Sequence, residues 1–170
     1  GIELCHTCFG VEACQMIDPT LLLQPDDYVQ LIDQAEMNPI KGDLLIFVLD
    51  RSPEKDAIVA AVTKSWQLYP YDIGPKFGDS TRSFEERIQM PVAQWLRGFQ
   101  EAKMVVTDSF HGCVFSILFQ KPFVAIGNAS RGMARFTSLL RTFGLEERLI
   151  CSLEEFQSRK SRLMMPIDYG

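Results

Sequence analysis

The residues best suited to chemistry form one short run from Thr107 to Gly112, with the sequence Thr-Asp-Ser-Phe-His-Gly. Its imidazole comes from His111, one of only two histidines in the chain. An imidazole titrates near neutral pH and can give and take a proton during turnover. Asp108 and Ser109 add a carboxylate and a hydroxyl, and Gly112 would let a ligand approach the backbone. The run predicts a proton-transfer or anion site.

The same residues also fit a purely structural role. Asp108 and Ser109 can cap a helix by accepting hydrogen bonds from its first N–H groups, and His111 can make a structural hydrogen bond. A helix that begins at the carboxyl end of a parallel strand is a common anion-binding place, which favours the functional interpretation. The residues alone leave the two interpretations about equally weighted.

A second polar cluster lies in the sequence from Gly127 to Gly132. Asn128 and Arg131 belong to it, and Arg135 follows Arg131 by about one helical turn, so both guanidinium groups would lie on one side of a helix. The planar guanidinium group suits a carboxylate or a phosphate. A solvated helix flank is the competing interpretation, at roughly equal weight.

Alternating strand and helix patterns must position these clusters. Residues 44–49 form a continuous apolar run typical of a parallel strand buried on both faces. The helix that begins at Pro91 carries a core-facing stripe of apolar residues at helical spacing: Val92, Trp95, Leu96 and Phe99. Further strands are predicted over residues 103–107 and 123–126, and further helices from Pro25, from Ser52, and over residues 111–120 and 131–143. The alternation predicts an α/β fold, a Rossmann-like three-layer sandwich with a mostly parallel sheet. Such sheets bind ligands outside the carboxyl ends of their strands.

Two regions fit this alternation less well. Residues 2–9 are expected to end a helix at Gly10, followed by a short strand over residues 11–17 and a break at residues 18–20. Residues 69–90 form the longest predicted loop, in which Arg82 and Arg87 leave a functional loop and a disordered one equally open.

Composition and charge limit the class of protein. The chain has 170 residues, 46% hydrophobic and 23% charged, as expected for one ordinary globular core. The net charge of −5 argues against a general nucleic-acid binder, whose affinity rests on neutralising phosphates. No apolar run approaches the roughly 18 residues that a membrane-spanning helix needs, and no signal peptide is recognisable.

Cysteine usage argues against disulfides and metal. Five cysteines are an odd number in a chain large enough to fold without crosslinks, so reduced thiols are expected. Cys5 and Cys8 have the spacing of a zinc pair, but no second pair completes four ligands. Cys113 lies in an apolar helix and is expected to be a core residue. No metal and no cofactor is predicted.

Several short motifs recur in order across nearly the whole chain. They are Asp18-Pro19-Thr20-Leu21-Leu22-Leu23, Trp95-Leu96, Val106-Thr107-Asp108-Ser109-Phe110-His111-Gly112 with Phe115-Ser116, Lys121-Pro122-Phe123, Arg135-Phe136 with Leu139-Leu140, and Gly144-Leu145-Glu146-Glu147-Arg148-Leu149. Together they resemble the polysaccharide pyruvyl transferase family.

The resemblance implies a two-domain architecture of the GT-B type, with two Rossmann-like halves facing a cleft. Residues 1–20 resemble the remnant of an N-terminal Rossmann-like domain, and residues 21–170 resemble the C-terminal Rossmann-like pyruvyl transferase domain. The chain is therefore expected to be an incomplete, inactive fragment whose partner is the missing N-terminal domain of the same protein.

The resemblance also implies an activity in bacterial exopolysaccharide biosynthesis. Pyruvate would pass from phosphoenolpyruvate to sugar hydroxyls of a polysaccharide or its lipid-linked precursor, forming a ketal. The protein would be cytoplasmic and would meet a lipid-linked acceptor at the inner face of the membrane. His111 matches the family's functional histidine and would act as acid and base. The expected substrate-binding residues are Asp108, Ser109, Phe110, Gly112, Asn128, Arg131 and Arg135.

Two other functions fit the same residues. A GT-B glycosyltransferase that uses a nucleotide sugar would need a similar fold and a similar anion site. A non-catalytic glycan-binding domain is the third possibility, because Ser109 stands where better-studied branches of the family often have an arginine.

Overall fold

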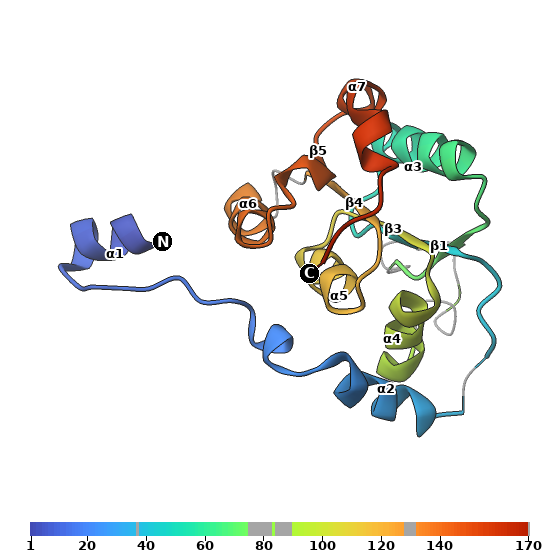
Figure 1. Cartoon of the computed structure of the whole chain (residues 1–170), viewed down its shortest axis with the longest axis horizontal. Helices are drawn as coiled ribbons and strands as arrows, with labels where there is room; N and C mark the ends of the chain where they lie inside the picture. Colours follow the sequence, from blue (N-terminus) through green and yellow to red (C-terminus); the bar gives the residue numbers. More distant parts are fainter. Residues whose placement is uncertain (37, 75–82, 84–89, 128–131, 170) are drawn as a thin grey trace.

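A five-stranded, all-parallel sheet with helices on both faces forms the centre of the molecule (Figure 1). This computed structural model describes residues 1–36, 38–74, 83, 90–127 and 132–169. The strand order is β2-β1-β3-β4-β5. The strands are β1 (Leu44–Phe47), β2 (Pro70–Asp72), β3 (Met104–Thr107), β4 (Phe123–Ile126) and β5 (Leu149–Ile150). The predicted Rossmann-like three-layer sandwich is confirmed.

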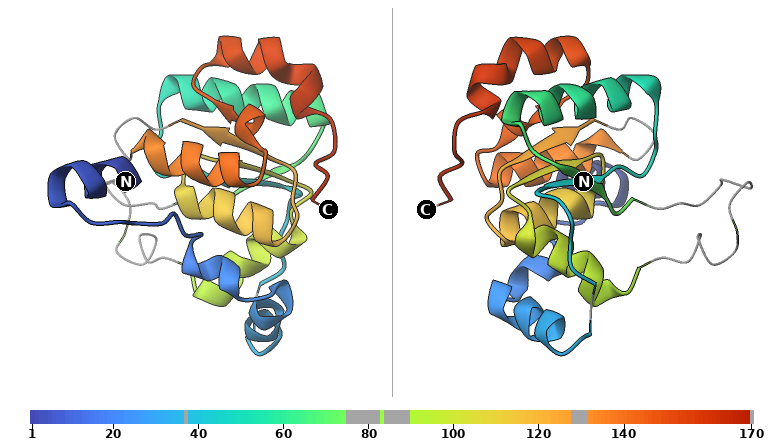
Figure 2. Two further views of the ribbon diagram at one scale, coloured as in Figure 1. Left: turned by 60° about the vertical axis from the view of Figure 1, so that its left-hand side comes forward. Right: turned by 90° about the vertical axis from the view of Figure 1, so that its right-hand side faces the viewer.

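Two apolar layers hold the helices against the sheet. On one face, α3 (Pro53–Trp66) and α7 (Leu153–Leu163) pack against strand residues such as Ile46 and Val106. On the other face, α4 (Val92–Glu101), α5 (Phe110–Leu118) and α6 (Met133–Thr142) pack against Leu45 and Val105. Figure 2 shows the three layers. Because successive strand residues point to opposite faces, an uninterrupted apolar strand is required to fill both layers.

Most of the predicted elements are present with small differences at their ends. The strand predicted over residues 123–126 is β4. The helix expected after Pro25 is α2 (Pro25–Asp33), which packs against α4. Helix α3 is capped by Ser52, whose hydroxyl accepts from the Lys55 N–H, and α1 (Ile2–Phe9) ends at Gly10 in the left-handed region at φ 63°.

The structure corrects the prediction in three places. Residues 11–17 do not form a strand, because no described strand lies beside them and their backbone amides find no ladder partner. The predicted loop over residues 69–90 contains strand β2, which pairs with β1 at the sheet edge; Arg82 and Arg87 lie outside the described residues. Val92, expected on the buried stripe of α4, is exposed in the first turn.

The C-terminal elements complete the domain. After α6, the short 3₁₀ helix η4 (Glu146–Arg148) leads into β5 and α7. Arg148 is buried, and its guanidinium donates to the carbonyls of Leu163 and Met165 at the end of α7. The bond to Leu163, the last residue of α7, satisfies a carbonyl group that a helix end leaves without a partner. Within the described part of the chain, no helix is both long and apolar enough to cross a membrane.

Candidate functional site

The chain reverses its direction across the sheet between β1 and β3. From β1 it passes to β2 on one side, and it then returns to β3 on the other side of β1. In open parallel sheets, ligands bind in the crevice at the carboxyl ends of the strands at such a reversal. The run from Asp108 to Gly112 begins directly after β3, at this edge.

Asp108 is fully buried and its carboxylate is bound by the protein itself. Oδ1 accepts from the backbone N–H of Leu49 at 2.6 Å, and Oδ2 accepts from the N–H of Asp50 at 3.1 Å. The ammonium group of Lys55 donates to Oδ2 at 2.6 Å and to the carbonyl of Asp50 at 2.8 Å. Asp108 therefore joins the end of β3 to the loop between β1 and α3 and does not cap α5.

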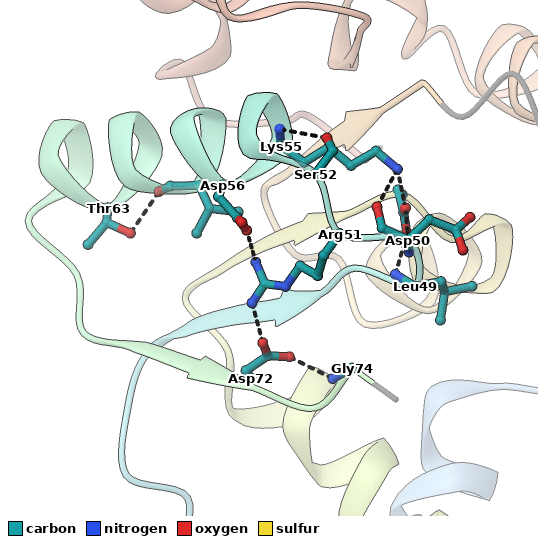
Figure 3. Close-up of polar contacts among 11 residues, drawn as sticks. Leu49, Asp50, Arg51, Ser52, Lys55, Asp56, Thr63, Asp72 and Gly74 are labelled. Carbon is teal, nitrogen blue, oxygen red and sulfur yellow. Dashed lines mark hydrogen bonds and ion pairs between the residues drawn. The ribbon is translucent and has the colours of Figure 1, made fainter. Parts of the chain in front are cut away.

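Figure 3 shows the charged residues of this loop. Lys55, in the first turn of α3, reaches back to Asp50, and Arg51 lies between Asp56 and Asp72 and pairs with both. Lys55 was missing from the residues singled out in the sequence. A lysine in the first turn of a helix gives no local signal that it will pair with a carboxylate on another strand.

Ser109 is the cap of α5. Its hydroxyl accepts from the Gly112 N–H at 3.4 Å, and its own N–H donates to the Thr107 hydroxyl at 3.0 Å. Thr107 in turn donates to the Phe47 carbonyl at 2.7 Å. A Cβ at position 112 would lie 2.1 Å from the Thr107 hydroxyl oxygen. The missing side chain of Gly112 thus makes room for Thr107.

We expect Gly112→Ala to destabilise the protein by about 1–3 kcal/mol, the usual cost of forcing extra volume into a packed region. At a permissive helix position the same change is stabilising by about 1 kcal/mol, so the sign of the effect identifies the clash. Chemical denaturation gives the free energy of unfolding. Gly98→Ala in α4 is the control, because its Cβ would meet no atom closer than 3.4 Å. Equal changes in the free energy of unfolding for the two substitutions would contradict the clash between a Cβ at position 112 and Thr107.

His111 lies in the first turn of α5 with 56% of its side chain exposed. Its Nε2 is 3.8 Å from Oδ2 of Asp18, which precedes the 3₁₀ helix η1 (Pro19–Leu22). That carboxylate also accepts from the Thr20 N–H at 3.0 Å. The structure thus brings together His111 and a carboxylate that sequence reasoning did not select. The only sequence feature that pointed to Asp18 was its place in the Asp-Pro-Thr motif, and that motif is equally typical of an ordinary turn.

Arg135 lies on the same side of the molecule. Its guanidinium carbon is 5.1 Å from the centroid of the Phe110 ring, within the range of a cation–π contact. A pocket of about 400 Å³ adjoins this pair, lined in part by Asp18, Phe110, Arg135 and Ser138. Asn128 and Arg131, the other two candidates from the second cluster, lie outside the described residues.

The comparisons with known proteins decide the family. The family model described as polysaccharide pyruvyl transferase matches residues 2–130. The chain belongs to the polysaccharide pyruvyl transferase family. Comparisons with curated proteins and with solved structures found no match. Family membership indicates a transferase whose general activity is pyruvyl transfer to polysaccharide.

The part that matches the pyruvyl transferase family contains both His111 and Asp18. It also contains the buried brace, by which we mean Asp108 with its partner Lys55. Arg135 and the rest of α6 follow the matched residues. Cys113, also within the match, is fully buried in α5, and burial raises the pKa of its thiol. A neutral buried thiol is a poor nucleophile, as the sequence interpretation expected.

The charges around Asp18 favour its ionised form. Burial alone raises the pKa of Asp18, but the hydrogen bonds from Thr20 and the positive charges of His111 and Arg135 outweigh it, so the net pKa is lowered. A carboxyl group with a lowered folded pKa adds stability above its unfolded pKa, and that stability is lost as the pH falls through the folded pKa.

We therefore expect Asp18→Asn to lower the free energy of unfolding at pH 7 by at most about 1 kcal/mol, as for partly exposed ion pairs. The difference from the unmodified chain should vanish below the folded pKa of Asp18, where both side chains are neutral. Denaturation at a series of pH values between 7 and 2 measures it. A difference that stays constant over this range would show that the charge of Asp18 is not what stabilises the fold.

Proposed function

We propose that the protein transfers pyruvate from phosphoenolpyruvate to sugar hydroxyls of a bacterial polysaccharide or its lipid-linked precursor, forming a ketal, with His111 as acid and base. The observation that carries the proposal is the position of His111: exposed, in the first turn of α5 at the carboxyl edge of the sheet, and close to a carboxylate. Within the family, a proton-transferring group at a ligand-binding edge fits the reaction that the family name describes.

The reaction requires proton transfer but no change of oxidation state. One sugar hydroxyl adds through its oxygen to C2 of phosphoenolpyruvate, while C3 gains a proton and becomes a methyl group. A second hydroxyl then displaces phosphate from C2 and closes the ketal ring. One hydroxyl proton is balanced by the proton on C3, and the other leaves with phosphate or to solvent. His111 would accept protons from the hydroxyls and supply the proton to C3.

The anionic donor also needs positive charge. Arg135 offers a guanidinium group beside the pocket, held over the Phe110 ring, and we propose that it contacts the carboxylate or the phosphate of the donor. Asn128 and Arg131 are proposed for the same task from the sequence alone. Buried Ser109 and Asp108 support the site through the start of α5 and the neighbouring loop.

We further propose that residues 1–20 belong to an N-terminal Rossmann-like domain and residues 21–170 to the C-terminal one, with the acceptor bound between the two. The apolar character of the first segment supports this division. Large apolar side chains such as Leu4, Phe9 and Met16 are exposed there. The protein would work in the cytoplasm, at the inner face of the membrane when the acceptor is lipid-linked.

The proposed function is tested with the full-length protein, including the proposed N-terminal domain, which is the enzyme in every activity assay below. It is incubated with phosphoenolpyruvate and lipid-linked or polysaccharide acceptors in heavy water. We expect release of phosphate together with a ketal methyl group that carries one solvent deuterium, because C3 is protonated during transfer. Consumption of a nucleotide sugar instead would identify a glycosyltransferase. Glycan binding without turnover of either donor would identify a binding domain.

A further inference from the structure

Asp18 and His111 are far apart in the sequence, and tertiary contacts fix them beside each other. The Tyr28 hydroxyl donates to the Thr20 carbonyl at 3.0 Å, and the Tyr28 ring meets the Phe115 ring of α5 edge to face, with centroids 5.3 Å apart. Leu21 packs into the same apolar layer. The segment that carries Asp18 is therefore held against α5.

We propose that Asp18 is the positioning residue of the site: its carboxylate orients the imidazole of His111 through Nε2 and stabilises the imidazolium that forms when His111 takes a proton. The inference rests on the proposed function of His111. The separation of 3.8 Å is longer than a hydrogen bond, and such contacts often tighten only when substrate binds. A fixed carboxylate behind a histidine base is effective because it favours one ring orientation and the charged form.

The chain contains a second histidine–carboxylate pair that lacks these features. Nε2 of His6 lies 3.7 Å from a carboxylate oxygen of Glu12, a nearly identical distance. However, the Glu12 side chain is 92% exposed, whereas that of Asp18 is 18% exposed and bonded to the Thr20 N–H. An exposed ion pair contributes little, because solvent screens the two charges and fixing the two side chains costs conformational entropy. Asp18 is suited to orient a reacting group because its carboxylate is restrained.

Several charged and titratable groups act on Asp18. His111 from α5 and Arg135 from α6 act on its carboxylate electrostatically. Burial, followed by the charges of Asp18 and Asp27, raises the pKa of Tyr28 in α2. The positive charge of Arg135 lowers the pKa of the Asp18 carboxyl and so favours its ionised form, and Nε2 is the imidazole nitrogen of His111 that faces this carboxylate. The hydrogen bonds from Thr20 and the positive charge of Arg135 thus favour a negative charge on Asp18, beside His111.

A titration of Asp18 tests the pairing without any need for activity. Carboxyl ¹³C signals of the full chain are followed against pH in the unmodified protein, in His111→Ala and in His6→Ala. We expect the pKa of Asp18 to rise in His111→Ala, because a neighbouring positive charge is lost, and to stay unchanged in His6→Ala. An Asp18 titration that is the same in all three proteins would overturn the inference.

Kinetics separate positioning from a purely structural role. We expect Asp18→Asn to lower kcat by about 10- to 100-fold with little change in KM, less than the roughly 10⁴-fold loss when a buried carboxylate behind a catalytic histidine is removed. Asp18→Glu should recover part of the rate, and Glu12→Gln should have no effect. In a His111→Ala background, Asp18→Asn should cause no further loss, since the two residues act as a unit.

The outcomes distinguish this inference from the proposed function. If Asp18→Asn lowers the kcat of His111→Ala as strongly as it lowers that of the unmodified enzyme, Asp18 does not act through His111 and the inference is overturned. If the unmodified enzyme transfers no pyruvate while the Asp18 titration still responds to His111→Ala, the proposed function fails and the pairing stands.

Discussion

Replacing His111 with alanine should reduce pyruvyl transfer by about 10²- to 10⁴-fold, the usual contribution of a general acid–base group. The imidazole is the group that we assign to proton transfer with the sugar hydroxyls and with C3 of phosphoenolpyruvate. Because its side chain is 56% exposed, its removal should change the free energy of unfolding by no more than about 0.5 kcal/mol. Phosphate release from phosphoenolpyruvate in the presence of acceptor gives the rate, and circular dichroism checks the fold.

His6→Ala is the matched control for this experiment. His6 lies in α1, is exposed, and also faces a carboxylate, but it is not at the edge of the sheet. We expect its replacement to leave the transfer rate unchanged. A His111→Ala enzyme that keeps the full rate would remove His111 from the mechanism, and equal losses in both variants would point to a general effect of histidine removal.

The residues of the site that could be predicted are those that lie close to one another in the sequence. His111 and Ser109 could be found because a strand, a polar turn and a helix follow one another within a few residues, and local patterns encode such turns. Asp18 could not be selected in this way. Its approach to His111 is set by the packing of Tyr28 and Leu21 against the helix layer, and no local pattern reports which distant segments will meet.

The fold was predictable to the extent that burial produces a pattern. Strands β1, β3 and β4 are buried on both faces, so their uninterrupted apolar runs identify them. Strand β2 has three residues, includes a proline, and pairs with β1 alone among the described strands, so nothing requires an apolar run there. Residues 11–17 show the opposite case, because a mostly apolar run without a sheet edge beside it does not make a strand.

The buried brace at Asp108 gives the largest expected change in stability. Asp108→Ala should lower the free energy of unfolding by about 3–5 kcal/mol, because it leaves the Lys55 ammonium without its carboxylate in a largely buried place. The backbone N–H groups of Leu49 and Asp50 would also lose their acceptor. Asp108→Asn, which keeps one acceptor oxygen but no charge, should be intermediate and remain measurable if the alanine variant does not fold. Urea denaturation at pH 7 gives the values.

Asp43 provides the matched comparison at the opposite edge of the sheet. It also accepts from a backbone N–H, that of Tyr69 at 2.7 Å, and from a lysine, Lys103 at 3.1 Å, but the Lys103 side chain is 71% exposed. We expect Asp43→Ala to cost about 1 kcal/mol, since water replaces the lost partner. Similar losses at the two positions would show that the burial of Asp108 is not decisive. A larger loss at Asp108 would mean that the start of α5, and with it His111, is held by an ion pair that water cannot replace.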